Sequence, residues 1–121
     1  MPQPKKLLVV EDQDEVRSIL VRILSDEGYH VIEASDGRQA VKFLDSEIGV
    51  DLVLTNIVMP GMDGLELAAQ VLSKSRTPIL FMTGYGQQHW YEPVPGPVLW
   101  KPFSPAVLCA EVRRVLERDV S

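Results

Sequence analysis

Five polar side chains occur along the chain at places where they could act together on a phosphoryl group. They are the adjacent acids Glu11 and Asp12, then Asn56, Thr83 and Lys101. Two adjacent carboxylates with an amide oxygen nearby supply the hard oxygen ligands that Mg²⁺ prefers, with waters completing the octahedron. A lysine ammonium brings a compact positive charge to a phosphate-like oxygen, and a threonine hydroxyl can donate a hydrogen bond to another. The set therefore suits phosphoryl chemistry, which depends mainly on positioning and charge neutralisation.

Each of these residues closely follows a short apolar run that predicts a β-strand. Four runs are rich in Val, Ile or Leu and do not alternate with polar residues, which is typical of strands buried on both faces: 7–10, 50–54, 79–82 and 98–100. A fifth strand is predicted over 30–34, after the helix-stop signal Gly28. In an open parallel sheet, ligands bind beyond the carboxyl ends of the strands. We therefore expect the five polar side chains to gather at one edge of the sheet.

Helical patterns separate the predicted strands. Apolar residues recur at helical spacing over 16–24, 40–44, 65–72 and 108–116. Three helix starts carry capping signals: Asp36 with Gln39, Asp63 with Glu66, and Ser104 with Pro105. This order of elements predicts an α/β fold with a parallel sheet and right-handed crossovers. We expect one domain over residues 1–121, without an output domain.

Composition and charge exclude several classes of protein. A chain of 121 residues can bury one hydrophobic core. The net charge of −5 argues against direct nucleic-acid binding, which needs a basic surface. The single cysteine, Cys109, cannot form an intrachain disulfide and fits a reducing compartment. No apolar run is long enough for a signal peptide or a membrane span, so we expect a cytoplasmic protein that does not bind membranes.

Four pieces of sequence occur in a distinctive order and spacing. They are Leu-Val-Val-Glu-Asp, Asp-Leu-Val-Leu-Thr-Asn-Ile-Val-Met-Pro-Gly-Met-Asp-Gly, Met-Thr-Gly and Lys-Pro-Phe. Together they resemble the CheY-like receiver domain of response regulators in two-component systems, over essentially the whole chain. The resemblance implies a doubly wound, five-stranded parallel sheet in the order 2-1-3-4-5, in a flavodoxin-like three-layer sandwich. It implies signal transduction in a phosphorelay, and not an enzyme activity.

The resemblance also implies roles for individual residues and partners for the chain. Thr83 and Lys101 would contact the phosphoryl group, and Pro102 would follow a cis peptide bond. The implied Mg²⁺ ligands are Glu11, Asp12, the phosphoacceptor position Asn56 and the backbone carbonyl of Val58. The implied phosphoryl donor is a sensor histidine kinase or a histidine phosphotransfer protein. A second copy of the chain or a downstream protein would read the signal.

Asn56 is the main departure from the family pattern, because the family has its phosphoacceptor aspartate there. A neutral amide oxygen is a poor nucleophile beside a carboxylate and would not give a stable acyl phosphate. We therefore expect no phosphorylation at this position. The loss of one negative charge also predicts weak Mg²⁺ binding. Two explanations remain open: a natural pseudo-receiver, or an engineered Asp→Asn block of a working receiver.

Two further departures concern the stretch before Lys101. Val98 occupies a position where the family usually has an aromatic switch residue. The stretch 84–97 looks shorter than usual and contains three prolines, which disfavour helix in the residues before them. It leaves room only for a short helix over 87–92. We expect this stretch to be the least regular part of the domain and to lack a conventional switch.

Two alternative interpretations remain. Asp12-Gln13-Asp14-Glu15-Val16 is also similar to the Asp-x-Asp start of haloacid-dehalogenase-type phosphatases, which likewise use Mg²⁺, a threonine and a lysine. Against this phosphatase hypothesis, no second acidic pair follows a later strand, and a short motif without its context is weak. A turnover assay on a phosphomonoester would distinguish it from a receiver. The other alternative is a purely structural protein–protein module with a relict pocket, which metal titration would reveal.

Overall fold

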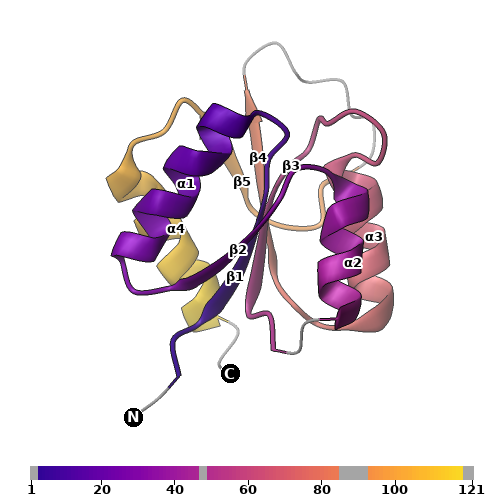
Figure 1. Cartoon of the computed structure of the whole chain (residues 1–121), viewed down its shortest axis with the longest axis horizontal. Helices are drawn as coiled ribbons and strands as arrows, with labels where there is room; N and C mark the ends of the chain where they lie inside the picture. Colours follow the sequence, from indigo (N-terminus) through magenta and orange to yellow (C-terminus); the bar gives the residue numbers. More distant parts are fainter. Residues whose placement is uncertain (1–2, 47–48, 85–92, 119–121) are drawn as a thin grey trace.

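Five parallel strands form a single sheet in the order β2-β1-β3-β4-β5, which confirms the predicted order (Figure 1). The strands are β1 (Lys6–Val10), β2 (His30–Ala34), β3 (Leu52–Asn56), β4 (Ile79–Gly84) and β5 (Val98–Lys101). The structure is a computed structural model, and it describes residues 3–46, 49–84 and 93–118. Neighbouring strands pair in parallel throughout, so their carboxyl ends share one edge of the sheet.

Helices cover both faces of the sheet, as the apolar strand sequences predicted. On one face lie α1 (Asp14–Asp26) and α4 (Pro105–Arg118), and on the other lie α2 (Gly37–Ser46) and α3 (Gly64–Lys74) (Figure 1). Successive strand residues point to opposite faces. In β1, Leu7 and Val9 therefore join the core under α1 and α4, whereas Leu8 and Val10 join the core under α2 and α3. None of the helices in the described ranges is both long and apolar enough to cross a membrane.

The strands end later than the apolar runs predicted. β3 covers Leu52–Asn56 rather than 50–54, and β4 and β5 continue through Thr83 and Lys101. The register pairs Asn56 with Met82 and Gly84 with Lys101. Backbone hydrogen bonds form the ladder, so it continues into polar residues after the apolar run stops. The polar side chains consequently lie on the last residues of the strands, where the sheet fixes their positions.

Three apolar residues that the sequence placed in the interior are exposed, which corrects those predictions. Trp100 is 39% exposed because β5 is an edge strand of the sheet. Ile19 is 59% exposed and Leu72 is 48% exposed, although both belong to predicted apolar stripes. The stripe of α1 that is buried against the sheet contains Leu20 and Leu24, and it does not extend to Ile19.

The predicted helix starts are confirmed by their capping hydrogen bonds. Asp63 accepts from the backbone N–H of Glu66, whose side chain accepts from the Asp63 N–H, and this pair forms a capping box. Asp36 accepts from the N–H of Gln39, and Ser104 accepts from the N–H of Val107. The Lys101–Pro102 peptide bond is cis, as expected.

Gly64, the first residue of α3, packs directly against the end of β3. A Cβ added to it would overlap the carbonyl oxygen of Asn56, which is backbone and cannot rotate away. Overpacking against rigid neighbours costs about 1–3 kcal/mol. We therefore expect Gly64→Ala to lower the free energy of unfolding by about 2–3 kcal/mol in urea titrations. Ser73→Ala, on the exposed side of the same helix, should change it by less than about 0.5 kcal/mol. Equal effects of the two substitutions would contradict this close approach.

The described part of the stretch 84–97 agrees with the predicted irregularity. Gly84 ends β4, and residues 93–97 belong to neither a helix nor a strand. The predicted short helix over 87–92 lies outside the described residues.

Candidate functional site

The strand ends bring four of the five predicted side chains into one hydrogen-bonded cluster. The Asn56 amide nitrogen donates to Glu11 Oε2 at 2.7 Å and to Asp12 Oδ1 at 3.0 Å. The Lys101 ammonium donates to Glu11 Oε1 at 2.7 Å. Asn56 and Lys101 end β3 and β5, and the acid pair follows β1. The prediction that these side chains meet at one edge of the sheet is therefore confirmed for these four.

Glu11 is the centre of the cluster, and its side chain is fully buried. Besides Lys101 and Asn56, the backbone N–H of Gln13 donates to its Oε2 at 3.0 Å. Burial acts to raise the pKa of Glu11. The hydrogen bonds from Lys101, Gln13 and Asn56, with the charge of Lys101, outweigh burial and hold the pKa below its usual value. Glu11 is therefore a carboxylate at neutral pH.

Thr83 lies beside the cluster but is not hydrogen-bonded to it. Its side chain is buried, and its Oγ1 has no hydrogen-bond partner among the residues that the structure describes. Buried hydroxyls are nearly always paired, so the Thr83 hydroxyl is available to donate to a ligand atom or a water. Because Met82 pairs with Asn56, Thr83 is the next residue along β4 from the level of Asn56. The phosphoryl-contacting role of Thr83 stays a prediction.

Val58 lies in the turn after β3 and is half-buried, with its side chain packed against the core under α2 and α3. Its predicted role uses the backbone carbonyl and also stays a prediction.

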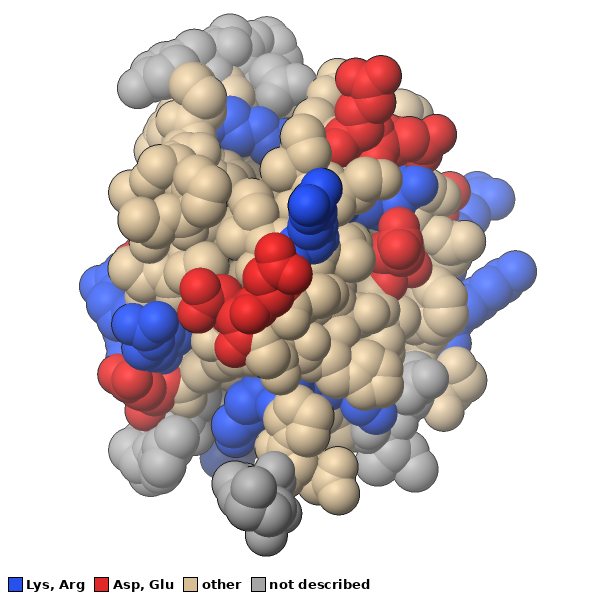
Figure 2. Space-filling model, turned by 60° about the vertical axis from the view of Figure 1, so that its left-hand side comes forward, with Lys and Arg blue, Asp and Glu red and all other residues tan. Residues whose placement is uncertain are grey.

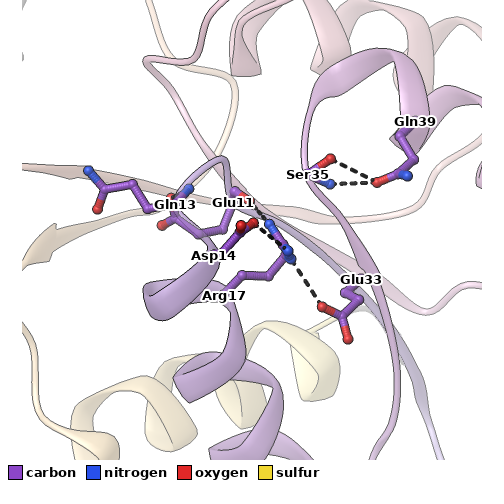
Figure 3. A network of polar contacts seen from close by, with 7 residues as sticks. All are labelled: Glu11, Gln13, Asp14, Arg17, Glu33, Ser35 and Gln39. Carbon is purple, nitrogen blue, oxygen red and sulfur yellow. Dashed lines mark hydrogen bonds and ion pairs between the residues drawn. The ribbon is translucent and has the colours of Figure 1, made fainter.

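Arg17 is a residue of this region that the sequence interpretation missed. Its guanidinium donates to the Glu11 backbone carbonyl at 3.0 Å, to Asp14 at 2.7 Å and to Glu33 at 3.0 Å (Figure 3). These bonds tie α1 to the end of β1 and to β2, and they fix the loop that carries the acid pair. The spacing of Asp14 and Arg17 in the sequence was a usable signal, because side chains three residues apart meet on a helix. The contact with the Glu11 carbonyl had no such signal.

The cluster has the right atoms for Mg²⁺, but their arrangement does not fit the ion. Both carboxylates accept hydrogen bonds from the amide nitrogen of Asn56, so an N–H donor lies between the oxygens that a cation would need. The other oxygen of Glu11 is bound to Lys101. Within the described residues, no three His, Cys, Asp or Glu side chains gather where they could hold a metal ion.

Comparison with known proteins identifies one family over most of the chain. The family model of the response regulator receiver domain matches residues 7–113. The chain is 34% identical over 117 residues to the transcriptional regulatory protein ResD of Bacillus subtilis (strain 168), covering 93% of this chain and 48% of ResD.

Solved structures are similar over most of the chain. The N-terminal domain of a response regulator/sensory box/GGDEF protein from Carboxydothermus hydrogenoformans superposes with a TM-score of 0.85 and 30% identity, covering 97% of this chain and all of that one. The chemotaxis protein CheY4 of Vibrio cholerae gives a TM-score of 0.79 and 29% identity, covering 93% of this chain and 98% of CheY4. The chain spans about half the length of the curated relatives that it matches.

Proposed function

The chain belongs to the family of response regulator receiver domains, and from this we propose that it serves a two-component phosphorelay without accepting a phosphoryl group at Asn56. One observation supports the proposal that Asn56 accepts no phosphoryl group. Asn56 occupies the end of β3, and its amide nitrogen is bound to both acids of the pocket. An amide lacks the negative oxygen that attacks phosphorus, and its adduct would not be a stable acyl phosphate. The cluster is proposed to be regulatory rather than catalytic.

The proposed partner is a sensor histidine kinase or a histidine phosphotransfer protein, with a second copy of the chain or a downstream protein as reader. The side of the molecule formed by α1 and α4 suits a protein partner. Ile19 and Val107 are 59% and 48% exposed there, and a hollow of about 270 Å³ lies between the helices, lined by Ile23, Asp26, Glu27, Pro105, Ala106 and Cys109. Figure 2 turns this side forward and shows broad uncharged areas between small groups of charged side chains. Apolar side chains exposed beside a hollow are candidates for contact with a partner protein.

The phosphatase alternative has no support from the comparisons. The family match extends over nearly the whole sheet, and the described strand ends hold a single acidic pair, Glu11 and Asp12. We propose that residues 1–121 form one receiver domain that acts in the cytoplasm, where the unpaired Cys109 would stay reduced.

The proposed function is tested directly with a small phosphoryl donor. Incubation of the unaltered protein with acetyl phosphate and MgCl₂ should leave its intact mass unchanged. A receiver domain that carries the acceptor aspartate, treated in the same way, verifies that the donor is active. A phosphorylated product of the unaltered chain that survives desalting would overturn the proposal.

Divalent metal binding is expected to be weak. Mg²⁺ would have to compete with the Asn56 amide and with Lys101 for the same carboxylate oxygens. Isothermal titration with MgCl₂ should therefore give a dissociation constant in the millimolar range or weaker, by comparison with about 1 mM for the weakest natural calcium modules. Asp12→Asn should abolish the remaining binding. Tight binding that does not depend on Asp12 would place the metal elsewhere.

A further inference from the structure

We propose that the Asn56 amide takes the place of a divalent cation in this pocket and holds the domain in one metal-independent state. The inference deepens the proposed function and rests on it, because it explains how a receiver that accepts no phosphoryl group keeps its pocket assembled. Asn56 thus lacks the carboxylate of a phosphoacceptor, and it also acts as a structural cross-link between strand ends.

The first step of the argument is the bridging geometry of the amide. One nitrogen lies 2.7 Å from a Glu11 oxygen and 3.0 Å from an Asp12 oxygen. A primary amide nitrogen carries two hydrogens, one for each carboxylate. Its orientation is fixed chemically, since carboxylates only accept hydrogen bonds and the amide oxygen would face them with like partial charge. The nitrogen therefore holds two adjacent acids together, as a bound cation would.

The second step is the charge balance of the pocket. Glu11 is fully buried, and Lys101, whose side chain is 25% exposed, is its charged partner. The exposed Asp12 has the Asn56 amide as its hydrogen-bond partner in this cluster. An aspartate at position 56 would place a third carboxylate at hydrogen-bonding distance from the other two, facing a single ammonium. Like charges this close strongly disfavour joint ionisation, so that arrangement would need an added cation.

The third step is mechanical. The chain of contacts from Lys101 through Glu11 and Asn56 to Asp12 joins the carboxyl ends of β5, β1 and β3. Charge-assisted hydrogen bonds of this kind are about twice as strong as neutral ones. Any cation that enters must first break both bonds of the Asn56 amide. The pocket is consequently closed in the absence of metal, and its state does not follow the Mg²⁺ concentration.

The experiment compares the unaltered protein with Asn56→Asp and Asn56→Ala by thermal unfolding, in EDTA and in excess MgCl₂. The unaltered protein should unfold at nearly the same temperature in both buffers, because its weak Mg²⁺ binding adds little stability. Asn56→Asp should unfold about 5 °C or more lower in EDTA and recover in MgCl₂. Asn56→Ala loses the cross-link without adding a charge, so it should also unfold at a lower temperature in EDTA. Calorimetric titration should show Asn56→Asp binding Mg²⁺ at least about tenfold more tightly than the unaltered protein.

Gln70→Glu is the matched control, because it makes the same amide-to-carboxylate change on the exposed part of α3. It should leave both the unfolding temperature and its response to Mg²⁺ unchanged. If Asn56→Asp does not fold in EDTA, recovery of folding on addition of MgCl₂ supports the inference, and Asn56→Ala supplies the stability comparison. The inference fails if Asn56→Asp is as stable as the unaltered protein in EDTA, or if the unaltered protein is stabilised by Mg²⁺ as much as Asn56→Asp. Phosphorylation of the unaltered protein would instead overturn the proposed function, so the two failures are distinguishable.

Discussion

Asn56→Asp should convert the chain from one that gains no mass in acetyl phosphate and MgCl₂ into one that gains a single phosphoryl group. The substitution adds the missing nucleophile at the end of β3, where the sheet already holds position 56 beside Glu11 and Asp12. It also adds a third carboxylate, so a divalent cation gains a ligand and loses a competing N–H donor. We expect Lys101, which lies at Glu11, and Thr83, the next residue along β4 from the level of Asn56, to contact the phosphoryl oxygens. This change from no adduct to an adduct is the largest effect that we expect.

Intact-mass measurement before and after incubation tests this prediction. The adduct should be lost in alkaline hydroxylamine, as an acyl phosphate is, and a peptide digest should place it at position 56. Asn56→Ala is the control, since it disturbs the same hydrogen bonds without supplying a nucleophile and should gain nothing. If Asn56→Asp folds, binds Mg²⁺ and still gains no mass, the pocket is a relict that serves only as a structural module.

Lys101→Met should produce the largest loss of stability among substitutions of charged residues. It leaves the fully buried Glu11 carboxylate without the ammonium that now lies 2.7 Å from it. Removing one partner of a buried ion pair typically costs about 3–5 kcal/mol. Glu11 keeps its bonds from Asn56 and from the Gln13 N–H, so we expect a loss of about 3 kcal/mol in the free energy of unfolding, the lower end of that range. Urea titration monitored by circular dichroism gives the value.

Two comparisons make this result specific to the pair. Lys74→Met removes the ammonium of an ion pair with Asp45 in which both side chains are more than half exposed. Its effect should stay within about 1 kcal/mol, because solvent screens exposed pairs. Glu11→Gln combined with Lys101→Met should cost less than the sum of the two single substitutions, since each single substitution leaves an unpaired charge and the double variant leaves none. Additive losses would mean that Lys101 stabilises the domain through packing of its stem and not through Glu11.

The sequence predicted much of the site because the polar residues closely follow apolar runs that are simple to recognise, although the strands extend past these runs. Apolar runs without alternation place a strand under helices on both faces, and the residues that follow such runs must meet at one edge of a parallel sheet. Glu11, Asn56 and Lys101 come from positions far apart in the chain, yet this argument alone placed them together. The capping signals at Asp63 and Ser104 were equally local, and the structure confirms both. Each of these predictions depends on backbone geometry that a few neighbouring residues determine.

Other features could not be predicted, because they depend on elements that are distant in the sequence. The exposure of Ile19 and Trp100 depends on how α1 lies on the sheet and on β5 being its edge. The spacing of apolar residues shows which side of a helix faces the core, but not how many residues on that side are buried. Arg17 was overlooked because its bond to the Glu11 carbonyl depends on the path of the loop between β1 and α1.

The sequence by itself therefore determined the family, the order of the strands and the absence of a nucleophile at position 56. Residue types and their spacing carry that information, since a carboxamide is not a carboxylate in any fold. Only the tertiary structure decided what Asn56 does instead. Its amide nitrogen donates hydrogen bonds to Glu11 and Asp12, the two acids that follow β1. Only the tertiary structure showed that the Thr83 hydroxyl is buried and has no partner within the described part of the chain. Whether two polar atoms form a hydrogen bond depends on differences of a few tenths of an ångström in their separation, and the packing of the whole sheet sets that separation.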